Sequence, residues 1–335
     1  MNILVTGANG FLGRYIVRQL AARGDRVRVV CRRRDAEFDS LGLESVLADI
    51  REREKIIAAC AGMDAVIHVA AIAKMWGSWS EFYEINTLGT QHVIEGCRKH
   101  GVRRLVYTSS PSVTFAGEPQ ENTDESVPYP TRWLAHYPRS KALAEQQVMA
   151  ANGKDGLLTC ALRPHLIWGP GDNHLLPKLL ERARSGRLRR VGDGTNLIDT
   201  VYVENAAEAH LLALDRLLPG SPVAGSAYFI TQGEPIPLWD WVNQLLALAN
   251  IPPVEKGISL SAAYAIGWAM EKLWAILRRQ SDPPMTRFIA LQLGLPHYFN
   301  LTKARRDLEY GPTVSTAEGL RRLVADPIFR QPSAG

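Results

Sequence analysis

A glycine-rich segment near the amino terminus constrains this chain more than any other feature. Residues 7–13 have the sequence Gly-Ala-Asn-Gly-Phe-Leu-Gly, with a strand-like apolar run before them and a helical pattern over 10–23 after them. Glycines at this spacing permit a tight turn close to a pyrophosphate, and the helix amino terminus supplies unpaired N–H groups. An ordinary strand–helix turn is the alternative. We expect dinucleotide contacts from Thr6, Gly7, Asn9, Gly10, Phe11, Leu12 and Gly13.

Short apolar runs alternate with helical patterns through the first half of the chain. Strands are expected at 3–6, 27–30, 45–48, 65–69, 104–108 and 158–162, and helices at 10–23, 52–61, 82–100 and 137–151. This alternation predicts an α/β fold, a Rossmann-type doubly wound parallel sheet covered by helices on both faces.

The pattern changes after Arg163-Pro164, where Pro, Gly and loop signals crowd together. Later strands are expected at 200–203 and 227–230, with a helix at 205–218. We therefore expect an NAD(P)-binding domain over 1–167 that also takes segments near 200–232. Residues 168–199 and 233–335 then form a smaller, mostly helical C-terminal substrate lobe.

Composition excludes several classes of protein. The net charge is +5, but the arginines form short dispersed clusters without a nucleic-acid-binding module, so nucleic acid is not an expected partner. Four cysteines without a Cys-x-x-Cys pair predict buried residues of a cytoplasmic protein and no metal site. No apolar run reaches 18 residues, so no membrane-spanning helix is expected.

The end of the second strand bears on the choice of cofactor. An acidic residue there binds the ribose hydroxyls of NAD, whereas arginine accommodates the 2′-phosphate of NADP. This chain has Arg32 and Arg33 there, and Asp35 comes late. The sequence therefore favours NADP(H) over NAD(H), with a solvated basic loop as the alternative. Further cofactor contacts are expected near the adenine and along the pyrophosphate and nicotinamide ribose, from Asp49, Ile50, Ala70 and Ala71.

Tyr137 and Lys141 form a Tyr-x-x-x-Lys pair on a predicted helix, where positions i and i+4 share a face. An ammonium beside a phenol favours the phenolate, so Lys141 is expected to lower the pKa of Tyr137 and make it a usable acid/base. A serine cluster ends the 104–108 strand. Ser110 is the first choice to hydrogen-bond the substrate oxygen, ahead of Ser109 and Ser112.

These motifs together resemble the extended short-chain dehydrogenases over nearly the whole chain. Further matching segments are Asn86-Thr-Leu-Gly-Thr90, Leu162-Arg-Pro164 and Trp168-Gly-Pro-Gly-Asp172. The chain is most similar to the 3β-hydroxysteroid dehydrogenase branch, through Trp76-Gly, Ser110-Pro-Ser-Val113 and Ala135-His-Tyr-Pro-Arg-Ser-Lys141. That branch includes sterol-4-carboxylate 3-dehydrogenases and the bacterial 2-alkyl-3-oxoalkanoate reductases of olefin biosynthesis.

The resemblance implies hydride exchange between a nicotinamide and a secondary alcohol or ketone, with Tyr137 handling the proton. It also implies a homodimer formed through residues 82–100 and 137–151. It adds cofactor contacts from Asn86, Thr108, Pro164, His165 and Ile167.

Aromatic residues after the fourth strand and in the tail favour a bulky hydrophobic substrate, a β-keto or β-hydroxy acid or a 3β-hydroxysterol or sterol carboxylate. Substrate contacts are expected from Lys74, Trp76, Ser112, His174 and Arg190, with Lys74 and Arg190 as partners for a carboxylate. A nucleotide-sugar epimerase and a non-catalytic NADP-sensing protein are the alternatives.

The apolar stretch 262–279 is interrupted by two charged residues and is too short to span a bilayer. A lid or core helix is favoured over a helix lying in a membrane surface. Peripheral association with a membrane or an enzyme complex therefore stays open.

Overall fold

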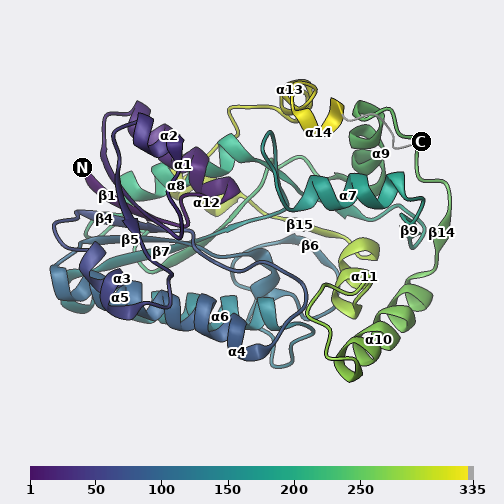
Figure 1. Ribbon diagram of the computed structural model, residues 1–335, viewed down its shortest axis with the longest axis horizontal. Helices are drawn as coiled ribbons and strands as arrows, with labels where there is room; N and C mark the ends of the chain where they lie inside the picture. The colour runs from purple at the N-terminus through teal and green to yellow at the C-terminus, as the bar shows by residue number, and fades with distance from the viewer. Residues whose placement is uncertain (331–335) are drawn as a thin grey trace.

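The computed structural model describes residues 1–330 and centres on a seven-stranded parallel sheet. The strand order is β12-β7-β5-β4-β1-β2-β3 (Figure 1). Strands β2 and β3 lie on one side of β1 and the later strands on the other, so the order of the strands reverses between β1 and β4. This confirms the expected doubly wound sheet. The strands are β1 (Asn2–Thr6), β2 (Arg26–Cys31), β3 (Glu44–Leu47), β4 (Ala65–His68), β5 (Arg104–Thr108), β7 (Leu158–Pro164) and β12 (Ser226–Ile230).

Helices cover both faces of this sheet (Figure 1). One face carries α1 (Phe11–Ala22), α8 (Val203–Arg216) and α12 (Thr302–Leu308), and the other carries α3 (Arg53–Ala59), α5 (Gly89–His100) and α6 (His136–Ala151). Side chains alternate along β1, so Ile3 and Val5 join one apolar layer while Leu4 joins the other. Burial on both faces explains why the strands are continuous apolar runs.

The helix expected at 82–100 is present, but it begins earlier and contains a wider turn that was not expected. It runs without a break through α4 (Trp79–Phe82), a π-helical turn η1 (Tyr83–Leu88) and α5. The wider turn carries Asn86, whose side-chain amide pairs with both backbone groups of Ile72, accepting at 2.8 Å and donating at 3.1 Å. This fixes the loop after β4, and an apolar periodicity does not reveal such a turn.

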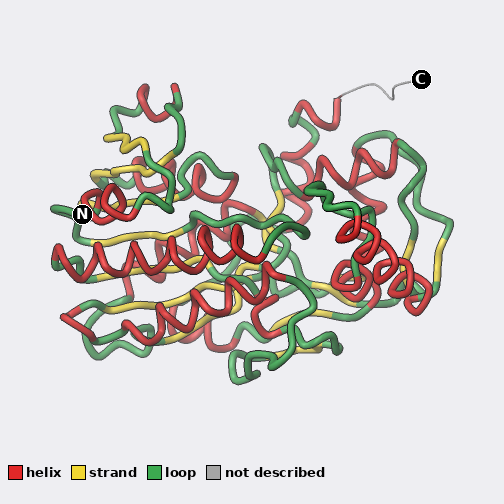
Figure 2. The backbone as a smooth tube through the Cα atoms, turned by 60° about the horizontal axis from the view of Figure 1, so that its bottom comes forward, coloured by secondary structure: helices red, strands yellow, loops and turns green. Residues whose placement is uncertain are grey.

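A second lobe lies beyond the carboxyl ends of the strands, as Figures 1 and 2 both show. Its small sheet has the order β13-β10-β15-β6, formed by Ile236–Pro237, Leu197–Ile198, His297–Phe299 and Gln120–Thr123. Its helices are α7 (Leu175–Arg184), α9 (Leu238–Leu248), α10 (Leu260–Ile276), α11 (Arg287–Gly294), α13 (Thr316–Leu323) and α14 (Pro327–Arg330). Trp168, Trp239 and Trp241 form part of its apolar core.

The glycine turn between β1 and α1 has no room for side chains. A Cβ atom on Gly7 would lie 2.6 Å from the backbone nitrogen of Ala70, and one on Gly13 would lie 2.2 Å from the carbonyl oxygen of Gly7. Gly7 also has a φ of +71°, which L residues rarely adopt. The turn can therefore bring the ends of β1 and β4 together only because these positions are glycine.

We expect Gly13→Ala to lower the free energy of unfolding by at least about 2 kcal/mol, because overpacking against a backbone oxygen cannot be relieved by a rotamer change. Denaturant unfolding measures this. Gly311→Ala is the matched control, since Gly311 lies outside the left-handed region and has open space around its Cβ position. Equal stability of the two variants would contradict the account of the turn.

Candidate active site

The helix α6 holds the catalytic candidates against the sheet. Tyr137, Lys141 and Glu145 follow one another at four-residue intervals along its length. Glu145 is fully buried and forms an ion pair with Arg163 of β7, with Nη2 and Oε1 2.6 Å apart. The Tyr129 hydroxyl donates to the same carboxylate at 2.7 Å. Burial opposes the charge of Glu145, but Arg163 keeps its pKa below the usual value.

Lys141 is buried beside β5. Its Nζ donates to the carbonyl oxygen of Thr108 at 2.6 Å and lies 4.2 Å from the ring centroid of Tyr107. Burial lowers the pKa of Lys141 to about 7, although the Glu145 carboxylate acts in the opposite direction. The lysine can therefore gain or lose a proton near neutral pH.

Among the protein's own groups, Lys141 does not lower the pKa of Tyr137, so this expectation is wrong. Burial raises the pKa of Tyr137, and the nearby Ser110 hydroxyl offsets this only in part. The effects on the Tyr137 pKa come from its own burial and from Ser110, and the Lys141 ammonium donates to the carbonyl oxygen of Thr108 instead. Tyr137 is consequently a proton donor in the protein alone.

The structure distinguishes the three serines after β5. Ser110 Oγ lies 2.9 Å from Ser112 Oγ, and Ser110 is the serine that affects the Tyr137 phenol. Ser109 Oγ is buried and has no hydrogen-bond partner among the described residues. The arrangement thus favours Ser110 as the partner of Tyr137.

The glycine turn presents the open amino terminus of α1, which has no side-chain cap. Its first N–H groups and positive dipole end are free to meet an anion, so the residues fit a dinucleotide pyrophosphate. The adjoining ends of β1 and β4 mark the point where the strand order reverses, the usual ligand crevice of such sheets. The carboxyl end of β4 contributes Ala70 and the exposed Ala71 to the same edge.

Sequence reasoning missed a buried hydrogen-bond chain beneath this turn. His68 Nδ1 lies 2.6 Å from Thr6 Oγ1, and His68 Nε2 lies 2.9 Å from Thr90 Oγ1. Burial lowers the pKa of His68 to about 3, so the ring is neutral. Thr90 donates in turn to the carbonyl oxygen of Asn86. Thr6 and Asn86 therefore position the turn and the loop after β4 through internal bonds.

The basic segment after β2 has both free and paired charges. Arg32 and Arg33 are exposed, and neither forms an ion pair with a described residue. Asp35 lies next to the glycine turn, because Asn9 donates to it at 3.0 Å, but its carboxylate is already bound to Arg14 at 2.5 Å. The late acid is thus neutralised, which the sequence spacing did not show.

The other expected cofactor residues lie along the same edge of the sheet. Asp49 follows β3 and accepts two hydrogen bonds from the Arg51 guanidinium, while Ile50 is buried against Gly89. Pro164 ends β7, and Ile167 begins the short strand β8 (Ile167–Trp168).

His165 lies between Pro164 and Ile167, with its ring edge-on to His297 at a centroid distance of 4.9 Å. Burial lowers the pKa of His165 well below its usual value. The ring is therefore neutral.

The expected substrate residues are only partly brought together. Trp76 lines a cavity of about 830 Å³ beside the start of α6. Lys74 is paired with Glu81 at 2.5 Å, and His174 is exposed at the start of α7. Arg190 lies on β9 (Arg190–Val191), at the outer edge of the second lobe and far from α6 in Figure 1.

The same cavity supplies other groups that sequence reasoning did not select. Aromatic side chains line it together with cationic ones: Phe82, Trp133, Arg132, His136, Arg139 and Lys272. Arg132, Arg139 and Lys272 form no ion pair with any residue of 1–330, although Arg139 stacks on the Trp79 ring at 4.2 Å. The cavity therefore combines apolar walls with free positive charge.

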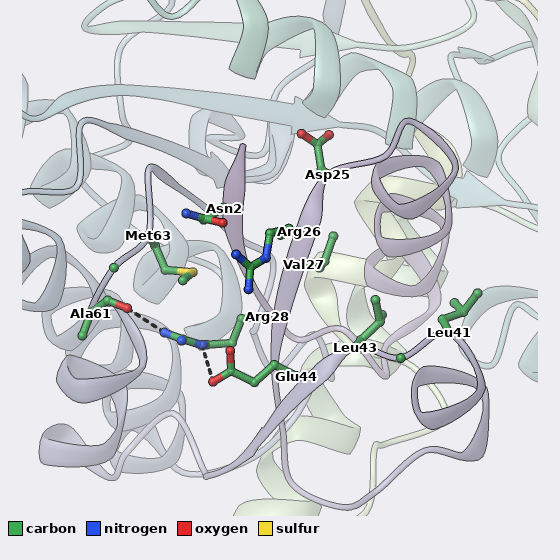
Figure 3. Close-up of a pocket in the computed structure, with 12 residues that line it drawn as sticks. Asn2, Asp25, Arg26, Val27, Arg28, Leu41, Leu43, Glu44, Ala61 and Met63 are labelled. Carbon is green, nitrogen blue, oxygen red and sulfur yellow. Dashed lines mark hydrogen bonds and ion pairs between the residues drawn. The ribbon is translucent and has the colours of Figure 1, made fainter.

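A second hollow of about 390 Å³ (Figure 3) is lined by residues at the amino ends of β1 and β2, whereas the catalytic candidates lie at the carboxyl ends of the strands. Its Arg28 donates to the carbonyl oxygen of Ala61 at 2.8 Å and pairs with Glu44 at 2.7 Å. These groups satisfy one another, and none of the expected site residues lies there.

Fold and site together define an NAD(P)-dependent oxidoreductase of the extended short-chain dehydrogenase type. A model of the 3-beta hydroxysteroid dehydrogenase/isomerase family matches residues 4–256. The chain belongs to this family, whose members interconvert hydroxyl and keto groups.

Individual relatives agree with this assignment. The chain is 50% identical over 327 residues to a 2-alkyl-3-oxoalkanoate reductase of Stenotrophomonas maltophilia, covering 97% of this chain and 99% of the relative. It is 43% identical to a protein of the same name from Shewanella oneidensis, covering 96% and 85%. A UDP-glucose 4-epimerase of Thermus thermophilus solved with NAD has a similar fold, with a TM-score of 0.72, 25% identity and coverage of 98% and 99%.

The buried lysine makes stability depend on pH in a predictable direction. Lys141 has a folded pKa of about 7 and an unfolded pKa of about 10.4, so the unfolded chain binds more protons between these values. Stability therefore rises with pH across this window. In Lys141→Met this rise is lost. The free energy of unfolding of the variant minus that of the wild type should therefore fall by more than about 1 kcal/mol from about pH 6 to about pH 9.

Denaturant unfolding at several pH values measures this difference. Losing the hydrogen bond to Thr108 changes the free energy of unfolding by an amount that does not depend on pH. Only the slope of the difference against pH therefore reports the pKa of Lys141. Lys99→Met, at an exposed position on α5, serves as the control and should show no such slope. A flat difference for Lys141→Met would show that Lys141 keeps its ordinary pKa.

Proposed function

We propose that this protein reduces the 3-ketone of a long-chain 2-alkyl-3-oxoalkanoic acid with NADPH. One observation carries the proposal: the cavity at the start of α6, lined by His136 and Arg139 on either side of Tyr137 in the chain, combines aromatic walls with three cations that have no carboxylate partner among the described residues. Trp76, Phe82 and Trp133 suit alkyl chains, and Arg132, Arg139 or Lys272 suits the carboxylate. The relatives at 50% and 43% identity carry the name of this activity.

The bound nicotinamide would supply the hydride to the ketone carbon. Ser110 and Tyr137 then hold the ketone oxygen through their hydroxyl groups, and Tyr137 gives its phenolic proton to that oxygen as negative charge develops. Lys141, one turn further along α6, then returns a proton to the phenolate and need not lower the pKa of Tyr137 beforehand. Because the pKa of Lys141 is about 7, both of its protonation states are populated at neutral pH.

A nucleotide-sugar epimerase is less well supported. The aromatic walls of the cavity suit an apolar substrate better than a sugar, and the epimerase of similar fold is only 25% identical. A non-catalytic NADP sensor would have no use for Tyr137 and Lys141 arranged in this way.

We expect Tyr137→Phe to lower the rate of NADPH oxidation with a long-chain 2-alkyl-3-oxoalkanoic acid by about 10²- to 10⁴-fold, because it removes the proton donor. The assay follows NADPH absorbance, and fluorescence titration should show NADPH binding unchanged. Tyr228→Phe is the control, since its hydroxyl bonds Asp307 and Pro222 away from the site. Full activity of Tyr137→Phe would exclude the assigned acid, and no turnover by the wild type would exclude this substrate.

The preference for NADP(H) over NAD(H) is part of the same proposal. Two free guanidinium groups follow β2, while Asp35, the acid beside the glycine turn, is neutralised by Arg14. A 2′-phosphate would find positive charge there, and the ribose hydroxyls of NAD would find no free carboxylate at Asp35.

Replacing Arg32 and Arg33 together by alanine should raise KM for NADPH by roughly tenfold or more, through loss of charge-assisted bonds, and leave KM for NADH nearly constant. Arg34→Ala is the control at the neighbouring exposed arginine. An equal change for both cofactors would show that these side chains do not read the 2′-phosphate.

A further inference from the structure

The helix α10 faces solvent with its apolar side. Its exposed large side chains, with exposed fractions of 43–77%, are Ile266, Trp268, Leu273 and Ile276, and Leu277 at its end is 50% exposed. The intervening exposed positions are mostly alanine, and Lys272 is the one charged side chain exposed within the helix. A surface helix of a monomeric globular protein normally shows the reverse pattern. Glu271, Lys272 and Ala275 line the cavity beside α6, so α10 also covers that cavity as the expected lid would, but the interpretation of 262–279 as a core helix is wrong for its outward face.

The inward face of α10 explains why its bulky apolar side chains are exposed. The helix packs on α11 through Ala263, Gly267 and Glu271. A Cβ on Gly267 would lie 2.5 Å from the carbonyl carbon of Thr286, and Glu271 accepts hydrogen bonds from the Arg287 backbone at 2.8 Å and its guanidinium at 2.7 Å. Small and polar contacts thus attach the helix. It lies at the edge of the molecule (Figure 1), and its bulky apolar side chains are exposed.

The charges around this face are of one sign. Lys272, Arg278 and Arg279 are exposed on or just after α10. The two acids of the segment are already engaged, Glu271 by Arg287 and Asp282 by Lys178 at 2.8 Å. Arg132 and Arg139, in the neighbouring cavity wall, add further free cations. An apolar surface rimmed by free cations is complementary to an anionic one.

We propose that α10 docks the protein on an anionic lipid bilayer, with its apolar face at the boundary between headgroups and acyl chains. No helix among residues 1–330 is long and apolar enough to cross a membrane, and the 17 residues of α10 extend only about 25 Å. The helix therefore lies in the membrane plane, where Ile266, Ile276 and Leu277 insert and Trp268 sits among the headgroups.

A second copy of the chain suits this face less well. Two such faces in contact would oppose Lys272, Arg278 and Arg279 to the same residues of the partner, and like charges across an interface are repulsive. Apart from the indole N–H of Trp268, the exposed apolar side chains also offer no hydrogen-bonding groups that would fix the register of a protein partner.

The test is sedimentation of the full-length protein with vesicles of phosphatidylcholine, with and without phosphatidylglycerol. The wild type should bind the anionic vesicles and not the neutral ones. The double variant Ile266→Ser, Ile276→Ser should reduce the partition coefficient roughly tenfold or more. Arg278→Gln and Arg279→Gln should reduce it about fivefold each. The double variant Leu218→Ser, Val324→Ser alters side chains that are 43% and 52% exposed elsewhere and should bind as the wild type does.

Absence of wild-type binding to anionic vesicles would overturn the proposal, as would equal binding by the α10 and control variants. Light scattering without lipid gives a second readout. If Ile266→Ser, Ile276→Ser converts an oligomer to a monomer, a second copy covers this face and the membrane proposal is wrong. None of these measurements depends on the substrate or on enzymatic activity, so they stand apart from the proposed reaction.

Discussion

The buried ion pair between Glu145 and Arg163 fastens α6 to β7 beneath the catalytic groups. Both side chains are almost fully withdrawn from water, and removing one partner of such a pair typically costs about 3–5 kcal/mol. Tyr137 and Lys141 precede Glu145 by two turns and one turn of the same helix, so their orientation toward the sheet follows from this attachment. The hydrogen bond from Lys141 to Thr108 then joins α6 to β5 as well.

The burial of Lys141 at the site lowers the stability of the folded chain. Lys141 is held where burial opposes its charge, with one carbonyl oxygen and an aromatic ring as its nearest partners. A lysine whose pKa lies near neutrality responds to small changes of charge around it, which is useful next to a tyrosine that must release a proton. The same burial destabilises the folded chain at low pH, so function and stability oppose each other at this residue.

The sequence predicted those features that depend on backbone geometry or local periodicity. The glycine turn, the parallel strands and the Tyr137–Lys141 spacing are of this kind, because neighbouring residues alone determine them. The π-helical turn around Asn86 was missed, and the hydrogen bonds that Asn86 makes there join it to the backbone of Ile72, fourteen residues away, which a local periodicity does not show.

Ion pairs between side chains that are distant in the sequence could not be predicted either, because local spacing does not show which residues meet in the fold. Lys74 is neutralised by Glu81 and Asp35 by Arg14, so residues selected for their charge are already engaged. Arg190 was expected near the substrate, but the lobe's irregular connections carry it to β9. The domain limits and the homodimer implied by family resemblance stay predictions.

The reaction proposed for this protein transfers a hydride from NADPH to the 3-ketone of a β-keto acid. The most direct test supplies NADPH carrying deuterium at nicotinamide C4 with a long-chain 2-alkyl-3-oxoalkanoic acid, and locates the label by mass spectrometry and NMR. When the deuterium is on the face of the ring from which hydride is transferred, we expect deuterium at C3 of the product and one cofactor oxidised per product formed. The proposed reaction would be wrong if the cofactor were oxidised but label on neither face of the ring reached C3, or if no product formed.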